Sequence, residues 1–250
     1  MPIHRNTKPI TWLASYPKSG NTWVRAILSS GLTGSCDINR LGYVVPSFRN
    51  AVKKVQFAPN QLEPNHNSAN FWGMAQRRAA FDISGKQIIF KTHIAALKYE
   101  GEQFPLESVT KRIIYIARDP RDVAISYANH YNLAVNQAIE NIMNQNNAVI
   151  DPENKEFEFI SSWEQHVTSW LALKQPKLII KYEELKDDAI AVIRRIFDFV
   201  EMKPLIGCEQ IAEQTSFKSL KNQEKKSGFV ESVNKKNFFN KGQSKQWKNS

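Results

Sequence analysis

Four short runs of this chain are apolar on both faces and rich in β-branched residues, and segments with helical periodicity accompany them. The runs are residues 10–16, 87–92, 112–117 and 177–182, and the helical segments are residues 21–30, 120–129, 160–173 and 187–200. A run that is apolar on both faces is typical of a strand in a parallel sheet. The alternation predicts an α/β fold, a single domain with a central, mostly parallel β-sheet flanked by helices. In such sheets ligands bind beyond the carboxyl ends of the strands.

Two segments show no clear pattern of a strand or a helix. Residues 41–84 show no clean period, contain three prolines and carry the aromatics Phe48, Phe57, Phe71 and Trp72. Residues 144–155 are rich in asparagine, and we expect a surface loop there.

The chain has 250 residues, which fits one domain with a substantial core. Its two isolated cysteines, Cys36 and Cys208, predict a reduced, cytoplasmic protein. No run approaches the ~18 apolar residues of a membrane span. The start lacks the apolar core of a secretory signal, and no CxxC or HExxH pattern occurs. We therefore expect no integral membrane segment and no metal site.

The formal net charge is +10, and nine lysines lie between residues 215 and 250. Such a balance suits a polyanionic partner: nucleic acid, an anionic membrane surface or a phosphorylated small molecule. No RRM, KH or helix-turn-helix signature is present, so nucleic acid is not the expected partner. The basic segment alone is equally explained as a solvated tail.

The first strand runs into the sequence YPKSGNTW at residues 16–23, which joins a strand to a helix through a glycine-containing loop. A helix N-terminus offers backbone N–H groups and a positive dipole end to an anion, and Lys18 adds a full charge. The loop is not the ATP-type P-loop, in which the lysine follows the glycines. An ordinary turn capped by Ser19 or Asn21 is the structural alternative.

Two further strand ends carry candidate functional residues. His93 follows the strand 87–92, and an imidazole with a near-neutral pKa can serve as a general base. Arg118 ends the strand 112–117 and Ser126 follows on the next helix, for which Asp119 is a plausible N-cap and Pro120 a suitable first residue. An arginine can bind phosphate in a bidentate manner, or simply pair with an aspartate.

In order and spacing these segments resemble the motifs of cytosolic-type sulfotransferases, which use 3′-phosphoadenosine-5′-phosphosulfate (PAPS). Residues 16–23 are similar to the family's YPKSGTTW loop, residues 91–93 to its KTH motif, and residues 118–127 to its 3′-phosphate motif. Tyr182 begins a Y-E-[DE]-L element, and Thr215 begins a TSF element. The resemblance implies a P-loop-NTPase-like sulfotransferase fold and a small-molecule acceptor.

The resemblance also assigns roles to residues. It implies that PAPS is bound by Lys18, Ser19, Gly20, Asn21, Thr22, Trp23, Arg118, Ser126, Tyr182, Thr215, Phe217, Lys241 and Gly242. It implies that the catalytic residues are His93 as base, Lys18 and Lys91 as stabilisers of charge, and Ser126 as a restraint on Lys18. Metal is not required. Residues 41–84 are expected on the acceptor side, and residues 215–250 are expected to close over the nucleotide.

Residues 240–249 depart from the family's RKGxxGDWKN pattern. Asn240 replaces the arginine, Lys245 the second glycine and Gln246 the aspartate. This leaves open a homologue that binds 3′,5′-ADP (PAP), the desulfated product, without catalysis. A kinase-like P-loop transferase is a further alternative. The sequence does not choose among phenol, alcohol, amine, sugar and lipid acceptors, and it does not give the oligomeric state.

Overall fold

The structure is a computed structural model that describes residues 8–57, 68–83, 86–151, 156–232, 238–239, 242 and 245–249. Its strands are β1 (Ile10–Ser15), β2 (Ile88–Thr92), β3 (Lys98–Tyr99), β4 (Glu102–Gln103), β5 (Thr110–Ala117), β6 (Ala148–Asp151), β7 (Glu156–Phe159) and β8 (Lys177–Lys181). Its α-helices are α1 (Asn21–Thr33), α2 (Leu41–Val44), α3 (Phe48–Gln56), α4 (Trp72–Asp82), α5 (Pro120–Tyr131), α6 (Val135–Met143), α7 (Trp163–Ala172), α8 (Tyr182–Asp187), α9 (Ala189–Val200), α10 (Cys208–Gln214) and α11 (Phe217–Ser227). The 3₁₀ helices among these described residues are η1 (Ile38–Arg40), η2 (Ser68–Phe71) and η3 (Gln246–Asn249).

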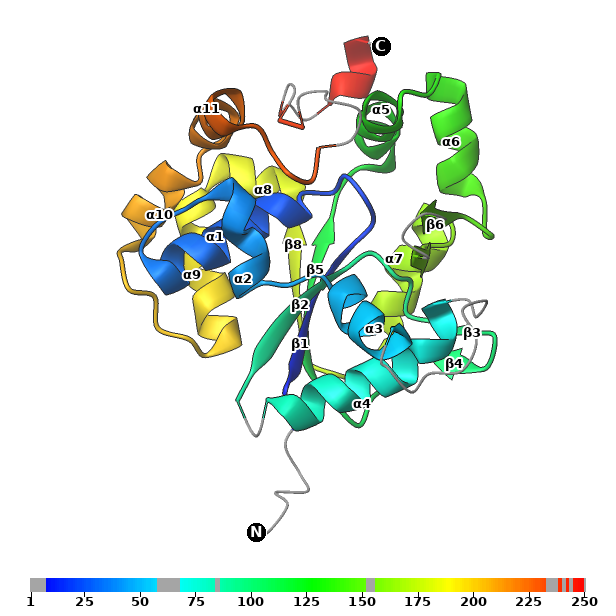
Figure 1. Ribbon diagram of the computed structural model, residues 1–250. Coiled ribbons are helices and arrows are strands. Elements are labelled where there is room, and N and C mark those ends of the chain that lie inside the picture. The colour runs from blue at the N-terminus through cyan, green and yellow to red at the C-terminus, as the bar shows by residue number, and fades with distance from the viewer. Residues whose placement is uncertain are drawn as a thin grey trace. The chain divides into compact units, whose positions relative to one another are not determined.

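The central sheet contains the four strands that the apolar runs predicted, in the order β2-β1-β5-β8 (Figure 1). β1 and β2 pair in parallel from Ile10 with Ile88 to Ala14 with Thr92. All six residues of β1 are buried, as expected for a strand covered on both faces. The predicted α/β class with a central parallel sheet is confirmed.

Residue contacts divide the chain into two compact units. The first unit comprises Met1–Tyr16, Pro46–Tyr115 and Ile142–Lys177, and the second comprises Pro17–Val45, Ile116–Asn141 and Leu178–Ser250. One domain over residues 1–250 stays a prediction.

An aromatic cluster forms the core of the first unit. Trp12 of β1 packs edge-on against Phe48 and Phe104, with ring centroids 5.1 and 4.9 Å apart. The indole Nε1 of Trp12 donates a hydrogen bond to Thr110 Oγ1 at 3.0 Å, so this buried polar group is satisfied. Phe48 is fully buried in this cluster, and its role is packing.

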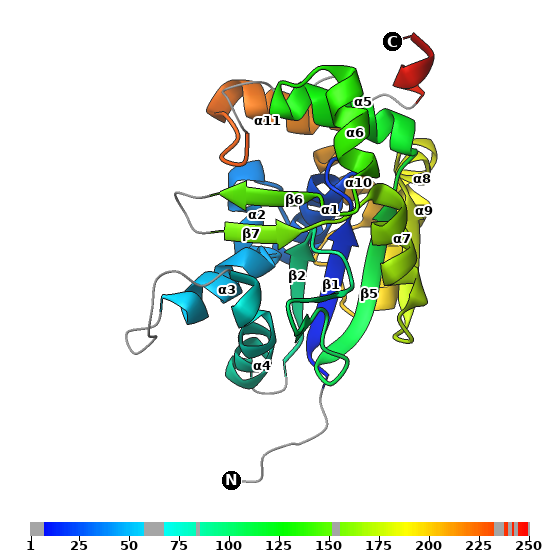
Figure 2. The same cartoon turned by 90° about the vertical axis from the view of Figure 1, so that its right-hand side faces the viewer.

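The two segments without clear periodicity contain regular elements, and the expectation of a surface loop over residues 144–155 was wrong. The described part of residues 41–84 is mostly helical: it forms α2, α3, η2 and α4, and α3 lies beside α4 (Figure 1). Residues 144–155 are not simply a loop, because Ala148 to Asp151 pair with β7 as an antiparallel hairpin (Figure 2). These helices and strands are short, so the periodicity of their side chains can be recognised only once the neighbouring element is known.

Candidate functional site

The donor loop, residues 17–23, joins β1 to α1 in the second unit. Lys18 and Gly20 have φ angles of 67° and 109°, so two left-handed residues turn the chain sharply before α1 begins at Asn21. A Cβ at position 20 would lie 2.9 Å from Cδ2 of Tyr182. Glycine is therefore required for both the backbone angle and the approach of the tyrosine ring.

The N-terminus of α1 has the character of an anion site. Gly20 is its N-cap, and within the part of the chain that the structure describes no side chain caps it, so neither Ser19 nor Asn21 fills the capping role. Ser19 is fully buried, and its Oγ has no hydrogen-bond partner among the described residues. A buried hydroxyl without a partner costs free energy, so a phosphate oxygen at this helix end would satisfy it.

Arg118, Tyr182 and Trp23 gather around the donor loop, as the resemblance implied. The Arg118 guanidinium donates to the carbonyl oxygen of Lys18 at 2.9 Å and lies over the Tyr182 ring, with Cζ 4.2 Å from its centroid. Trp23 meets the same ring edge-on at 5.8 Å. Burial raises the pKa of the Tyr182 hydroxyl, and Arg118 opposes that rise. The cluster therefore offers cationic and aromatic groups suited to a nucleotide.

Asp119, Ser126 and Thr215, which the sequence also singled out, lie on helices of the second unit or at their ends. Asp119 caps α5, accepting a hydrogen bond from the Arg121 N–H, and Ser126 lies half-buried on that helix. The Arg121 guanidinium lowers the pKa of the Asp119 carboxyl. Thr215 is buried and bonds to the carbonyl of Ile211 at 2.7 Å.

Residues near the C-terminus also reach this part of the second unit. The Phe217 ring would be 2.4 Å from a Cβ added at Gly242, so glycine lets the backbone lie against the ring. The Lys18 ammonium lies 3.8 Å from the centroid of Phe238. Lys241 and Asn240 lie outside the described residues.

Two buried carboxylates that the motifs did not single out for this role hold the C-terminal segment. Glu224 of α11 accepts the backbone N–H groups of Phe238 and Phe239 at 2.5 and 2.9 Å. Asp122, in the first turn of α5, accepts those of Lys245 and Gln246 at 2.7 Å each. Each carboxylate satisfies two adjacent backbone donors, so the segment is anchored at two points.

The predicted base, His93, lies in the first unit, just after β2. Its Nδ1 is 2.7 Å from the carbonyl oxygen of Ser15. A carbonyl can only accept a hydrogen bond, so Nδ1 carries the proton and Nε2 presents a lone pair. Burial lowers the pKa of His93 well below its usual value, and the charge of Lys91 lowers it further. His93 is therefore neutral at pH 7 and able to accept a proton.

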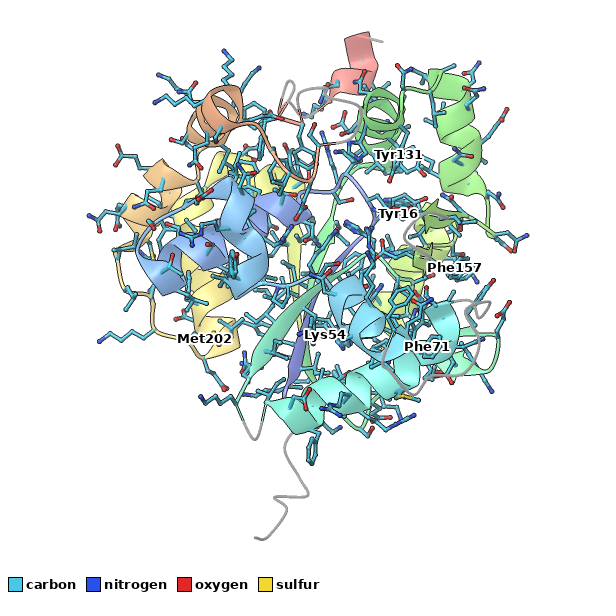
Figure 3. All side chains as sticks on the ribbon, in the orientation of Figure 1. Tyr16, Lys54, Phe71, Tyr131, Phe157 and Met202 are labelled. Carbon is cyan, nitrogen blue, oxygen red and sulfur yellow. The ribbon has the colours of Figure 1, made fainter. Side chains whose placement is uncertain are left out.

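His166, which belongs to none of the sequence motifs, contacts the backbone of His93. Its Nε2 is 3.1 Å from the His93 carbonyl oxygen, and its Nδ1 is 2.9 Å from the Tyr115 hydroxyl. These bonds make Nε2 the donor and Nδ1 the acceptor. Burial lowers the pKa of His166 to about 3. Tyr16, labelled in Figure 3, packs edge-on against this imidazole at 5.4 Å.

No cluster of histidine, cysteine or acidic residues that could hold a metal ion occurs among the described residues. Cys36 and Cys208 are free thiols, and burial raises the pKa of Cys36 to about 11. None of the helices that the structure describes is both long and apolar enough to span a bilayer.

The family model for the sulfotransferase domain matches residues 8–250, so this chain belongs to the sulfotransferase family. The predicted family and enzyme class are confirmed. The chain is 28% identical over 222 residues to luciferin sulfotransferase of Photinus pyralis, an alignment that covers 84% of this chain and 56% of that protein. It is 26% identical to sulfotransferase 1A1 of Rattus norvegicus, covering 95% and 77% of the two chains. It is also 26% identical to cytosolic sulfotransferase 8 of Arabidopsis thaliana, covering 94% and 70%.

Solved structures share the fold. Retinol dehydratase in complex with retinol and PAP superposes with a TM-score of 0.60 at 19% identity, covering 97% of this chain and 76% of that one. A mouse sulfotransferase in complex with PAP gives 0.58 at 22% identity, covering 97% and 78%. The predicted sulfotransferase fold is confirmed.

Proposed function

We propose that this chain transfers the sulfuryl group of PAPS to a hydroxyl or amine of a small-molecule acceptor. The observation that carries the proposal is the donor loop, where a buried, unpartnered Ser19 hydroxyl lies at an uncapped helix N-terminus beside Lys18. Two solved structures with this fold contain PAP. Relatives named as cytosolic enzymes support a cytoplasmic location.

The residues of the second unit suit the donor. Ser19 to Thr22 would bind the 5′-phosphate, as backbone donors and hydroxyls at a helix N-terminus do. Arg118 and Ser126 would bind the 3′-phosphate, and Trp23 and Tyr182 offer rings for adenine. Thr215, Phe217, Gly242 and Lys241 complete the proposed set.

PAPS supplies the sulfuryl group, and the protein supplies position and charge. The acceptor oxygen forms a bond to sulfur while the bond from sulfur to the 5′-phosphate oxygen breaks, as in phosphoryl transfer. Lys18 offsets the charge that develops on the leaving phosphate, and Lys91 offsets charge on the sulfuryl oxygens. The acceptor proton passes to Nε2 of His93.

The first test is calorimetric titration with 3′,5′-ADP, with 5′-AMP as the control ligand. Binding that depends on the 3′-phosphate is the expected result, and no binding by a folded sample would overturn the proposal. Release of 3′,5′-ADP from PAPS is then followed with a panel of hydroxyl and amine acceptors. We expect Lys18→Ala and His93→Ala each to lower turnover at least about a hundredfold.

The matched control is Lys186→Ala, which removes an exposed lysine elsewhere in the second unit. Near-normal turnover in Lys18→Ala or His93→Ala would remove that residue from the mechanism. Tight 3′,5′-ADP binding without turnover of any acceptor would favour a homologue that only binds the nucleotide.

A further inference from the structure

The ring of Phe238 faces Lys18, the lysine of the donor loop. The Lys18 ammonium lies 3.8 Å from the ring centroid, well inside the ~6 Å within which an aromatic face attracts a cation. The two residues come from opposite ends of the sequence but belong to the same compact unit. None of the sequence motifs singled out Phe238.

Aromatic neighbours hold this ring in place. Phe229 and Phe239 meet it edge-on, with ring centroids 4.9 and 5.2 Å away. His130 of α5 also meets it edge-on, at 5.8 Å. Edge-to-face contacts favour particular ring orientations. The face that Phe238 turns toward Lys18 is therefore set by the packing around it.

Glu224 fixes the backbone that carries the ring. Its buried carboxylate, on α11 (Figure 1), accepts the N–H groups of Phe238 and Phe239 at 2.5 and 2.9 Å. Hydrogen bonds to a charged acceptor are stronger than neutral ones. Phe239 is also buried in an apolar cluster with Phe229 and with Leu220 of α11. Backbone and side-chain contacts thus both attach this short segment to α11.

Lys18 is held at its backbone as well. Its φ of 67° is uncommon for a residue other than glycine, and Arg118 donates to its carbonyl oxygen at 2.9 Å. A fixed backbone does not fix the ammonium, because the lysine stem is flexible and has high rotamer entropy. Phe238 supplies a contact at the ammonium itself.

An aromatic ring suits this task better than a carboxylate would. A carboxylate would offset the charge of the ammonium, whereas a ring attracts the cation and adds no net charge. The positive charge of Lys18 then remains available to an anion that binds at the donor loop.

We propose that Phe238 is a positioning residue for Lys18, and that its ring holds the ammonium where the 5′-phosphate of the donor binds. The inference rests on the proposed function, because it assigns a partner to a lysine of that same site. The opposite effect, in which the ring withholds Lys18 from the nucleotide, predicts tighter nucleotide binding once the ring is removed.

The contact is tested by NMR on the full chain with ¹³C-labelled lysine, without nucleotide. The Lys18 Hε signal is identified by its loss in Lys18→Arg, and the Phe238 ring current should shift it upfield of the exposed lysines. The shift should vanish in Phe238→Leu and persist in Phe81→Leu, which removes a phenylalanine that is 75% exposed. A wild-type Lys18 signal among those of the exposed lysines would overturn the proposal.

The consequence for binding is measured by calorimetry with 3′,5′-ADP, whose 5′-phosphate corresponds to the leaving group, and with 3′-AMP, which lacks that phosphate. We expect Phe238→Leu to weaken 3′,5′-ADP binding about tenfold and to change 3′-AMP binding less than about twofold. In Lys18→Met the same substitution should change 3′,5′-ADP binding less than about twofold, because the ammonium is gone. Equal losses in the two backgrounds, equal losses for the two ligands, or tighter binding by Phe238→Leu would each contradict the assignment.

A second substitution preserves the packing of the ring. Phe238→3,4,5-trifluorophenylalanine keeps an aromatic side chain of nearly the same size but weakens the negative potential of its face. It should weaken 3′,5′-ADP binding about threefold, since the attraction for the ammonium depends on that potential. Unchanged affinity would show that the ring does not act through its attraction for the cation.

The two proposals fail in different ways. If the Lys18 signal depends on Phe238 but 3′,5′-ADP does not bind to the folded wild type, the contact stands and sulfuryl transfer falls, together with the role given to the contact. If 3′,5′-ADP binds and the Lys18 signal lies among those of the exposed lysines, the donor site stands and the positioning role of Phe238 falls.

Discussion

Asp122 should control the order of the C-terminal segment. Its carboxylate is 1% exposed and accepts the N–H groups of Lys245 and Gln246, each at 2.7 Å. A hydrogen bond to a charged group contributes about 1.5–3 kcal/mol, and neighbouring bonds are not additive. We therefore expect Asp122→Ala to lower the free energy of opening this segment by about 3 kcal/mol. Because about 1.4 kcal/mol corresponds to a factor of ten, protection should fall roughly a hundredfold.

The assay is amide hydrogen exchange at residues 245 and 246, measured by NMR. Asp122→Asn keeps one neutral acceptor oxygen and should lose about half of that free energy, which corresponds to roughly a tenfold fall in protection. Asp187→Asn, the same charge change at an exposed position, is the control. If both amides keep wild-type protection within about twofold in Asp122→Ala, Asp122 is not the anchor and the reasoning fails.

Two further predictions concern buried groups elsewhere. Burial lowers the pKa of His166 from 6.5 to about 3. The stability that the neutral, buried imidazole contributes is therefore fully present above pH 6.5 and is lost as the pH falls toward 3. The free energy of unfolding, measured with urea between pH 7 and 5, should depend less steeply on pH in His166→Gln than in the wild type, by up to about 1.4 kcal/mol per pH unit. Equal slopes in the two proteins would contradict this. Gly20→Ala should destabilise the protein by about 1–3 kcal/mol through its φ of 109° and the Tyr182 contact. Gly42→Ala, with no heavy atom within 4 Å of the added Cβ, should be near neutral, and an equal loss in both variants would count against the steric explanation.

Local patterns identified the sheet and the donor loop well. The four apolar runs became the four central strands within two residues at each end, because burial on both faces demands continuous apolar side chains. Asp119 and Pro120 predicted the start of α5, since capping depends on residues adjacent in the chain. The rule about strand ends pointed to Lys18, His93 and Arg118 as functional candidates.

Short elements were harder to predict. α3 has nine residues, and Phe48, Val52 and Val55 form its buried side, but prolines flank the region and obscure the period. β6 was mistaken for part of a loop because its four residues are ordered by pairing with β7. Neither segment carries enough apolar residues to define its structure without a neighbour.

The chain order of residues is enough to specify strand positions, helix caps and the left-handed donor loop, because these depend on side chains within a few positions of one another. The hydrogen bonds of the Asp122 carboxylate, here called the Asp122 clamp, join it to Lys245 and Gln246, which lie 123 and 124 positions further along the chain. The contact between His166 and the His93 carbonyl spans 73 positions. Such pairs form only after the chain has folded and water has been excluded from both partners. Burial then strengthens the clamp and depresses the pKa of His166, and neither effect exists in a local segment.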